Sequence, residues 1–158
     1  MTQIKPGTPP LDDVTHAASQ NGDWFLQTIV RMVNTTALRV PVTLTLGGGL
    51  VSGDLISGKE YFAAIGDMFA TAPAADGNQI GAQLASHFAG HGETVYGPTE
   101  NNTDQAGMTR HAFIHLKNAR FVDNAGAIPD AGLLWRGRID EVIGFSLGSV
   151  RTSPKSDG

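Results

Sequence analysis

The chain has 158 residues, a length typical of a single domain of ~100–200 residues. Its 11 basic and 15 acidic residues give a net charge of -4, which argues against a protein that binds nucleic acid through basic side chains. It contains no cysteine, which excludes disulfides, thiolate metal sites and a cysteine nucleophile. The N-terminus has no apolar run typical of a signal peptide, and no stretch approaches ~20 consecutive apolar residues. We therefore expect a cytoplasmic protein with no membrane segment.

The composition along the chain predicts one folded domain over residues 21–150. Residues 1–20 include three prolines and few large apolar side chains, which is typical of a flexible arm. Residues 151–158 are polar and are predicted to form a flexible tail. Residues 57–110 are predicted to be an insertion of helices and loops within the domain, and their second half is rich in Ala, Gly, Asn and Thr.

A leading helix is predicted from Asp23 onward, where Asp23 or Asn21 can cap its first turn. Its apolar side chains recur at helical spacing and form a wide stripe: Trp24, Phe25, Leu26, Ile29, Val30, Met32 and Val33. Residues 40–46 then alternate between apolar and polar types, which predicts a half-buried strand. Three glycines supply a tight turn, and a second strand over residues 50–56 completes a hairpin.

A second helical region is predicted after Ser57. Ser57 and Glu60 have the spacing of a capping box, in which each side chain accepts a hydrogen bond from the other residue's backbone N–H. A further helix is predicted over residues 78–89, because Ile80, Leu84 and Phe88 fall on one face. Residues 90–107 are predicted to be a long loop.

Alternating apolar residues return at Ala112 and predict a third strand, followed by a turn-rich connection over residues 123–132. Residues 133–147 are too long for one strand and predict two strands that meet near Asp140 and Glu141. Trp135, Phe145 and Phe121 are predicted core residues. The fold class predicted is α+β: an N-terminal helix on a small, strongly bent, closed or nearly closed five-stranded antiparallel β-barrel, with a helical insertion between strands two and three.

Three segments resemble one known family. They are GLVSGDLISGKEYF (residues 49–62), AFIHLKNARFV (112–122) and LLWRGRIDEVIGFSLG (133–148). Their order and spacing resemble the gas vesicle accessory proteins of the GvpU family, whose vesicles are air-filled protein shells that give bacteria buoyancy. The resemblance implies a non-catalytic accessory protein without a cofactor that is associated with gas vesicles. It also implies contacts with the shell or with other accessory proteins, through which vesicle formation or clustering is influenced.

A second resemblance concerns the fold. Gly53-Asp54-Leu55, residues 113–119 and residues 136–139 resemble the two signature segments of Sm-like proteins. That resemblance implies a helix on a small bent barrel and, as an alternative function, an RNA-binding oligomer. However, residues 57–111 interrupt the first signature, and the Asp and Asn that contact RNA bases in that family have no evident counterpart. Exposed strand edges nevertheless favour a homo-oligomer, because unpaired edges offer backbone donors and acceptors to a second chain.

The candidate interaction residues are basic. Arg136 and Arg138 are expected on one strand face, with Lys117 and Arg120 elsewhere in the sequence. They are interpreted either as an anion- or partner-docking patch or as partners of Asp140, Glu141 and Asp123 on a solvated surface.

The histidines are the candidate metal ligands. His87 and His91 have the i, i+4 spacing of a helical metal site, with Glu93 as a possible third ligand. His111 and His115 are predicted to share a strand face. The alternative interpretation is that all four are ordinary histidines, and no catalytic, metal or cofactor residue is assigned. Neither a nucleophile elbow nor a phosphate loop is present in the sequence, so we do not expect an enzyme.

Overall fold

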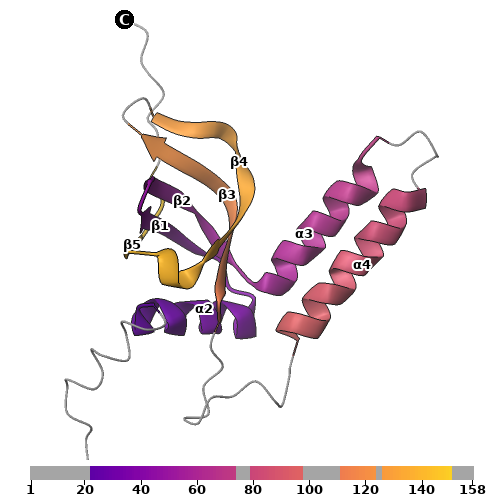
Figure 1. The fold of residues 1–158 in the computed structure, drawn as a ribbon, viewed down its shortest axis with the longest axis horizontal. Coiled ribbons are helices and arrows are strands. Elements are labelled where there is room, and N and C mark those ends of the chain that lie inside the picture. The colour runs from indigo at the N-terminus through magenta and orange to yellow at the C-terminus, as the bar shows by residue number, and fades with distance from the viewer. Residues whose placement is uncertain (1–21, 74–78, 98–110, 124–125, 151–158) are drawn as a thin grey trace, which may run out of the picture.

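The computed structural model describes residues 22–73, 79–97, 111–123 and 126–150. The predicted arm at residues 1–20 and the predicted tail at 151–158 lie outside the described residues, as do residues 74–78 and 98–110 of the predicted insertion. Figure 1 shows the elements in their chain order: α2 (Trp24–Thr36), β1 (Val40–Leu46), β2 (Gly49–Ile56), α3 (Gly58–Thr71), α4 (Gln79–Tyr96), β3 (Phe113–Asp123), β4 (Gly126–Arg138), the 3-10 helix η1 (Ile139–Glu141) and β5 (Gly144–Leu147).

The leading helix α2 begins at its predicted cap. The Asp23 carboxylate accepts hydrogen bonds from the backbone N–H groups of Phe25, at 2.8 Å, and Leu26, at 3.0 Å, which satisfies donors that have no partner inside the helix. The buried stripe is narrower than predicted. It consists of Leu26, Ile29, Val30 and Val33, whereas Trp24, Phe25 and Met32 are exposed.

The five strands form one antiparallel sheet in the order β4-β3-β2-β1-β5. One face of this sheet packs against α2 to form the core (Figure 1). The sheet contributes buried side chains at alternate positions, as expected for strands with one buried face: Val42, Leu44, Val51, Leu55, Ile114 and Leu116. Trp135 and Phe145 pack against this core from its rim, whereas Phe121 is exposed, so its predicted core position is wrong.

The predicted closure into a barrel is wrong, because the sheet is open. Within the described residues, β4 pairs only with β3, and β5 pairs only with β1. β4 and β5 are therefore the two edges of the sheet. β5 has four residues, which pair with residues 42–45 of β1, and η1 separates it from β4 along the chain. Such a short strand offers little backbone with which to reach across and join the far edge.

Two further boundaries differ from the prediction. β4 begins at Gly126, so most of the predicted connection over residues 123–132 is strand. α4 continues to Tyr96, so the loop predicted from residue 90 is wrong for residues 90–96, and residues 98–107 lie outside the described residues. The strand break predicted near Asp140 and Glu141 is confirmed by η1.

Helices α3 and α4 lie side by side and project from the sheet as a helical hairpin (Figure 1). The Ser57 hydroxyl accepts from the Glu60 backbone N–H at 3.1 Å, as predicted, but the Glu60 carboxylate pairs with Arg39 at 2.7 Å instead of returning to Ser57. Glycines allow the two helices to approach closely. A Cβ atom at Gly66 would lie 2.9 Å from the Ala85 carbonyl oxygen, a distance that real Cβ atoms do not show.

Two alanine substitutions in the hairpin are expected to act in opposite directions. Gly66→Ala should lower the free energy of unfolding by about 1–3 kcal/mol, because the added methyl group overpacks the contact between the helices. Gly90→Ala has open space around its Cβ position and should raise the free energy of unfolding by roughly 0.5–1 kcal/mol through helix propensity. Urea unfolding followed by circular dichroism measures both values. Equal shifts in the same direction would contradict the close helix packing.

Candidate functional site at the root of the helical hairpin

The outer face of β3 and β4, away from α2, carries four of the ionisable groups that the sequence singled out: Lys117, His115, Arg136 and Arg138. The register of the two strands pairs His115 with Arg136 and Phe113 with Arg138. Lys117 follows His115 at the next position on this face, because alternate residues of a strand point the same way. The root of the helical hairpin packs against this part of the sheet, where α3 contacts both β3 and β4.

His115 is enclosed at this junction, and 1% of its surface is exposed. Three aromatic rings of the hairpin surround its imidazole: Tyr61 at 4.8 Å, Tyr96 at 5.2 Å and Phe62 at 6.2 Å between ring centroids. Arg136 Nε donates to His115 Nε2 at 3.3 Å, and the Tyr96 hydroxyl lies 3.4 Å from the same nitrogen. Because Arg136 can only donate, Nε2 is the unprotonated acceptor and the proton of the neutral ring is on Nδ1.

The Arg136 guanidinium completes the cluster. Its Cζ lies 3.4 Å from the centre of the Phe113 ring, which is the geometry of a cation–π contact. Burial, helped by the charges of Arg136 and His111, lowers the pKa of His115 from 6.5 to about 3. Burial also raises the pKa of Tyr61. His115 is therefore neutral near pH 7, which suits a structural contact and not a proton donor in acid–base chemistry.

The predicted interaction residues are placed as follows. Lys117 Nζ lies 3.6 Å from Glu60 Oε1. The Arg138 guanidinium donates two hydrogen bonds to the Asp140 carboxylate, and the bond from Nε to Oδ1 is 2.9 Å long. The pairing of Arg138 with Asp140 was one of the two interpretations of these residues. Arg136, Arg138 and Lys117 thus share one face, and each contacts groups of this chain.

Arg120 lies apart from the other three. It lines a small polar cavity of about 300 Å³ with Asp54, Asn118 and Ser52, where the β2–β3 register shifts. Asn118 Nδ2 donates to Asp54 Oδ2 at 2.9 Å, and the Asn118 backbone has a left-handed φ of 53°. The structure therefore does not bring all four predicted basic residues into one patch.

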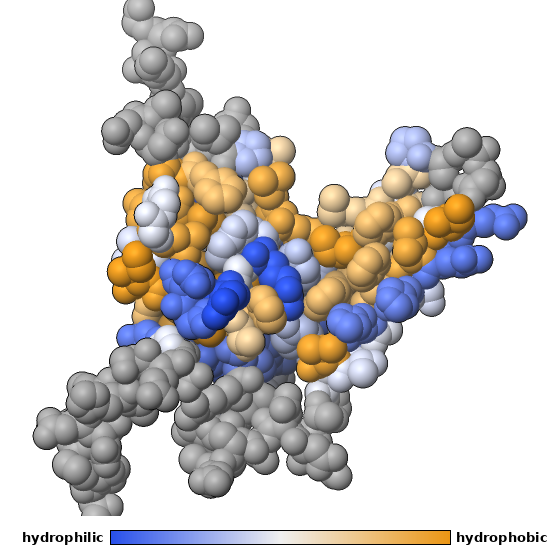
Figure 2. Space-filling model, viewed as in Figure 1, coloured by the Kyte–Doolittle hydropathy of each residue, from blue (hydrophilic) through white to orange (hydrophobic). Residues whose placement is uncertain are grey.

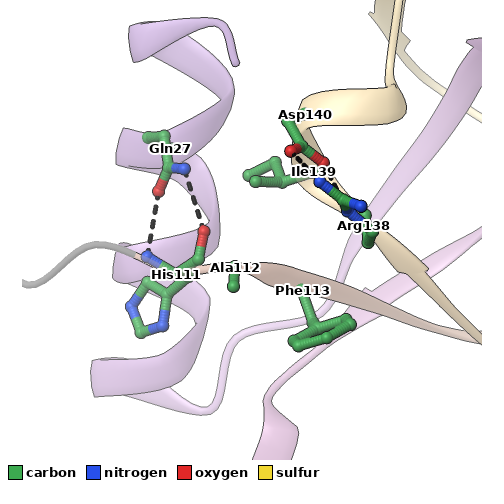
Figure 3. A pocket seen from close by; sticks show the side chains of 7 residues that line it. All are labelled: Gln27, His111, Ala112, Phe113, Arg138, Ile139 and Asp140. Atoms are coloured by element: carbon green, nitrogen blue, oxygen red, sulfur yellow. Dashed lines mark hydrogen bonds and ion pairs between the residues drawn. The ribbon is translucent and has the colours of Figure 1, made fainter. Parts of the chain in front are cut away.

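A larger cavity of about 440 Å³ opens between α2, the start of β3 and η1 (Figure 3). The Gln27 side-chain amide donates to the His111 carbonyl at 2.9 Å and accepts from the His111 backbone N–H at 3.2 Å. The Arg138–Asp140 pair lies on the opposite wall, and Phe113 and Ile139 add apolar surface. Burial and the charge of Arg31 lower the pKa of His111. The Gln27 hydrogen bonds therefore connect α2 to the start of β3 on one side of the cavity.

The candidate metal ligands on α4 have other contacts. The His91 ring packs against Phe62 at 5.1 Å, the His87 ring against Phe88 at 5.6 Å, and Glu93 pairs with Lys59 at 2.6 Å. Within the part of the chain that the structure describes, no three His, Cys, Asp or Glu side chains gather closely enough to hold a metal ion.

The aromatic enclosure of His115 was not predicted. The periodicity of β3 indicated only which face this histidine shares, and the apolar positions of the helix after Ser57 were not related to this strand. The available signal was Tyr61 and Phe62, which lie within five residues of the Ser57 cap and so are near the root of the helix. The preceding strand, β2, ends at Ile56, which pairs with His115.

Comparison with known proteins gives one match. The family described as gas vesicle protein GvpU-like matches residues 23–150, which includes every described helix and strand. No curated protein and no solved structure matches the chain. Among the described helices, none has both the length and the apolar character needed to cross a membrane.

The low pKa of His115 makes the stability of the fold depend on pH. The unfolded chain binds a proton at this histidine more readily than the folded protein does. The stabilisation is therefore complete above the ordinary pKa of 6.5 and is lost as the pH falls toward 3. We expect this group to lower the free energy of unfolding by roughly 2 kcal/mol between pH 7.5 and pH 5.

Urea unfolding of three proteins at both pH values checks this expectation. His115→Gln keeps an oxygen that can accept from Arg136 but does not titrate, so its stability should change less with pH than that of the unsubstituted protein. Ser86→Gln, at an exposed position of α4, should keep the full pH dependence. An unchanged pH dependence in His115→Gln would contradict the neutral, buried state of the ring.

Proposed function

The chain belongs to the GvpU-like family of gas vesicle proteins, and from this premise we propose that it acts through protein–protein contacts in vesicle formation or clustering, without catalysis. The partners proposed are the vesicle shell or other accessory proteins, with further copies of the chain, and the place of action is the cytoplasm. His115 is the most buried ionisable side chain among the described residues. It supports this proposal, because it is neutral and bonded to Arg136. The exposed surfaces of the fold are therefore the proposed sites of contact.

The observation on which the proposal rests is an apolar rim at the edge strand β5. The apolar rim consists of Trp24, Phe25, Phe145 and Leu147. Trp24 is 59% exposed, Phe25 45% and Leu147 60%. The rings form a chain of contacts, with 5.7 Å from Trp24 to Phe25 and 5.7 Å from Phe25 to Phe145. Hydrophobic side chains also gather over this edge in Figure 2. Aromatic side chains clustered on an exposed surface are typical of protein interfaces.

Among the residues that the structure describes, no strand pairs with the outer edge of β5, which adds backbone hydrogen-bonding groups to this rim. The other sheet edge, β4, is longer and offers the same groups to a second chain. Arg138 and Arg136 lie on the outer face of β4 and are proposed to contribute a basic contact surface, with Lys117 beside them. Arg120, at the smaller polar cavity, is proposed to contribute a separate contact.

Flotation with intact gas vesicles tests the proposed contact. Buoyant vesicles are mixed with purified protein and collected at the surface by centrifugation, and we expect the protein to rise with them. Trp24→Glu and Leu147→Glu each place a charge on the apolar rim and should reduce the bound fraction at least about tenfold, as removal of an interface anchor does.

Ser146→Glu is the matched control. Ser146 is exposed on the same strand and pairs with Thr43 on the other face of the sheet, so this variant should still float with the vesicles. Circular dichroism verifies that all three variants fold. Equal binding by the rim variants and the control would overturn the role of the rim, and absence of flotation by the unsubstituted protein would overturn the proposed contact.

An Sm-like RNA-binding oligomer is the second candidate. The observation in its favour is the arrangement of a helix followed by five antiparallel strands in one sheet. The net charge of -4 argues against it, because affinity for RNA comes mainly from basic side chains that contact phosphates.

Filter binding with oligo-U and oligo-A separates the two functions. We expect that neither oligonucleotide binds with an affinity that falls steeply as the salt concentration rises, since such a fall indicates contacts to phosphates. Tight, salt-dependent binding of either oligonucleotide would instead favour the RNA-binding candidate over vesicle contacts.

A further inference from the structure

The helical hairpin leaves its large apolar side chains without full cover. The residues of α3 and α4 that are buried are all glycines: Gly58, Gly66, Gly81 and Gly92. By contrast, α2 buries four large apolar side chains. Helices in proteins gain most of their stability by packing an apolar face. The hairpin therefore offers apolar surface that this chain does not cover with its described residues.

The contacts between the helices define two faces of the hairpin. The seam is the line along which α3 and α4 touch. It is marked by three contacts: Gly58 with the Tyr96 ring, Gly66 with Ala85, and Gly92 with Phe62. Positions one residue after the seam lie together on one side, as the 2.6 Å ion pair between Lys59 and Glu93 demonstrates. In an antiparallel pair of helices, positions one residue before the seam share the opposite side.

These two sides differ in chemistry. The polar face holds the charged residues Lys59, Asp67 and Glu93, with small residues between them. The opposite side, called here the apolar face, has no Asp, Glu, Lys or Arg and consists of Tyr61, Ile65, Met68, Ile80, Leu84, His87, His91 and Val95. Met68 and Ile80 are each 59% exposed and Val95 is 44% exposed. In Figure 2 the hairpin is hydrophobic over much of its length and hydrophilic along its lower edge.

We propose that the apolar face of the hairpin binds the same face of a second copy, so that two hairpins form an antiparallel four-helix bundle. The charge distribution supports this occupant. The protein carries a net charge of -4, yet Asp67 and Glu93 lie on the other side of the hairpin, so two identical apolar faces meet without like-charge repulsion. A twofold interface of identical surfaces is also the commonest form of assembly.

The area of the apolar face is sufficient for a specific interface. A helix of the length of α4 spans about 27 Å, and two helices side by side are about 20 Å wide. The face therefore offers roughly 500 Å² per copy and about 1,000 Å² for the pair, the area at which specific interfaces begin. The end of the apolar face nearest the sheet is held in place, because Tyr61 packs on the enclosed His115.

This inference rests on the proposed action through protein contacts, but it names one surface and one partner that can be tested without vesicles. Sedimentation equilibrium of the purified protein should give twice the 16.6 kDa mass of one chain. Met68→Glu and Leu84→Glu should each weaken the dimer at least about 30-fold, the effect of losing an interface hot spot. Ala82→Glu places the same charge on the exposed polar face of α4 and should leave the dimer intact.

Thiol labelling provides a second measurement that does not depend on how a charge is tolerated. The chain has no cysteine, so Ile80→Cys and Ala82→Cys each carry a single thiol. Labelling of Ile80→Cys by a maleimide should slow as protein concentration rises, whereas labelling of Ala82→Cys should not. A monomeric unsubstituted protein would overturn this assignment. It would also be overturned if both Glu variants remained dimers and the labelling rate of Ile80→Cys did not change with protein concentration.

Flotation of the same variants separates this inference from the proposed function. If Met68→Glu and Leu84→Glu are monomeric and still float with vesicles, both proposals stand, and each concerns a different surface. If these variants remain dimers but no longer float, the apolar face binds the shell instead of a second copy, and the dimer proposal is overturned while vesicle contact survives.

Discussion

A neutral histidine holds the helical hairpin on the outer face of the sheet, and the shape of the whole molecule depends on this contact. His115 accepts from Arg136 on the neighbouring strand and is covered by the rings of Tyr61 and Tyr96 from the two helices. Its pKa is low chiefly because burial removes the water that would stabilise a charged ring. A charged ring would also lose the Arg136 bond and face a second cation. The same contact leaves the rest of α3 and α4 extending beyond the sheet.

Local patterns were sufficient to predict most of the elements. The Asp23 and Ser57 caps and the alternation in β1 and β2 involve residues that are close in sequence, so their geometry follows from short-range rules. The end of α4 and the start of β4 were misplaced because glycines and small residues there resemble loop composition. In α4, Gly92 packs against Phe62 of the other helix, so tertiary contact overrides the weak helix propensity of glycine.

The candidate site was harder to predict, because its residues come from three separate parts of the sequence. Tyr61 and Tyr96 reach His115 only when α3 and α4 fold back beside β3, and no spacing rule relates those positions. The same limit applies to barrel closure. Alternation indicates which side chains face the core, but whether the two outer strands meet depends on the length of β5 and on the turn at η1, neither of which alternation encodes.

The two uncovered apolar surfaces lie on different parts of the fold, and this separation bears on clustering. The apolar rim borders β5 at one edge of the sheet. In Figure 1 this strand and the hairpin of α3 and α4 lie on opposite sides of the sheet. A molecule with one such surface can coat a vesicle but cannot join two of them. If two copies pair through their hairpins in antiparallel fashion, each pair carries two rims separated by at least about 27 Å, the length of one helix. Such a pair is bivalent, so even a weak contact at each rim holds neighbouring vesicles together once many pairs act at the same surfaces.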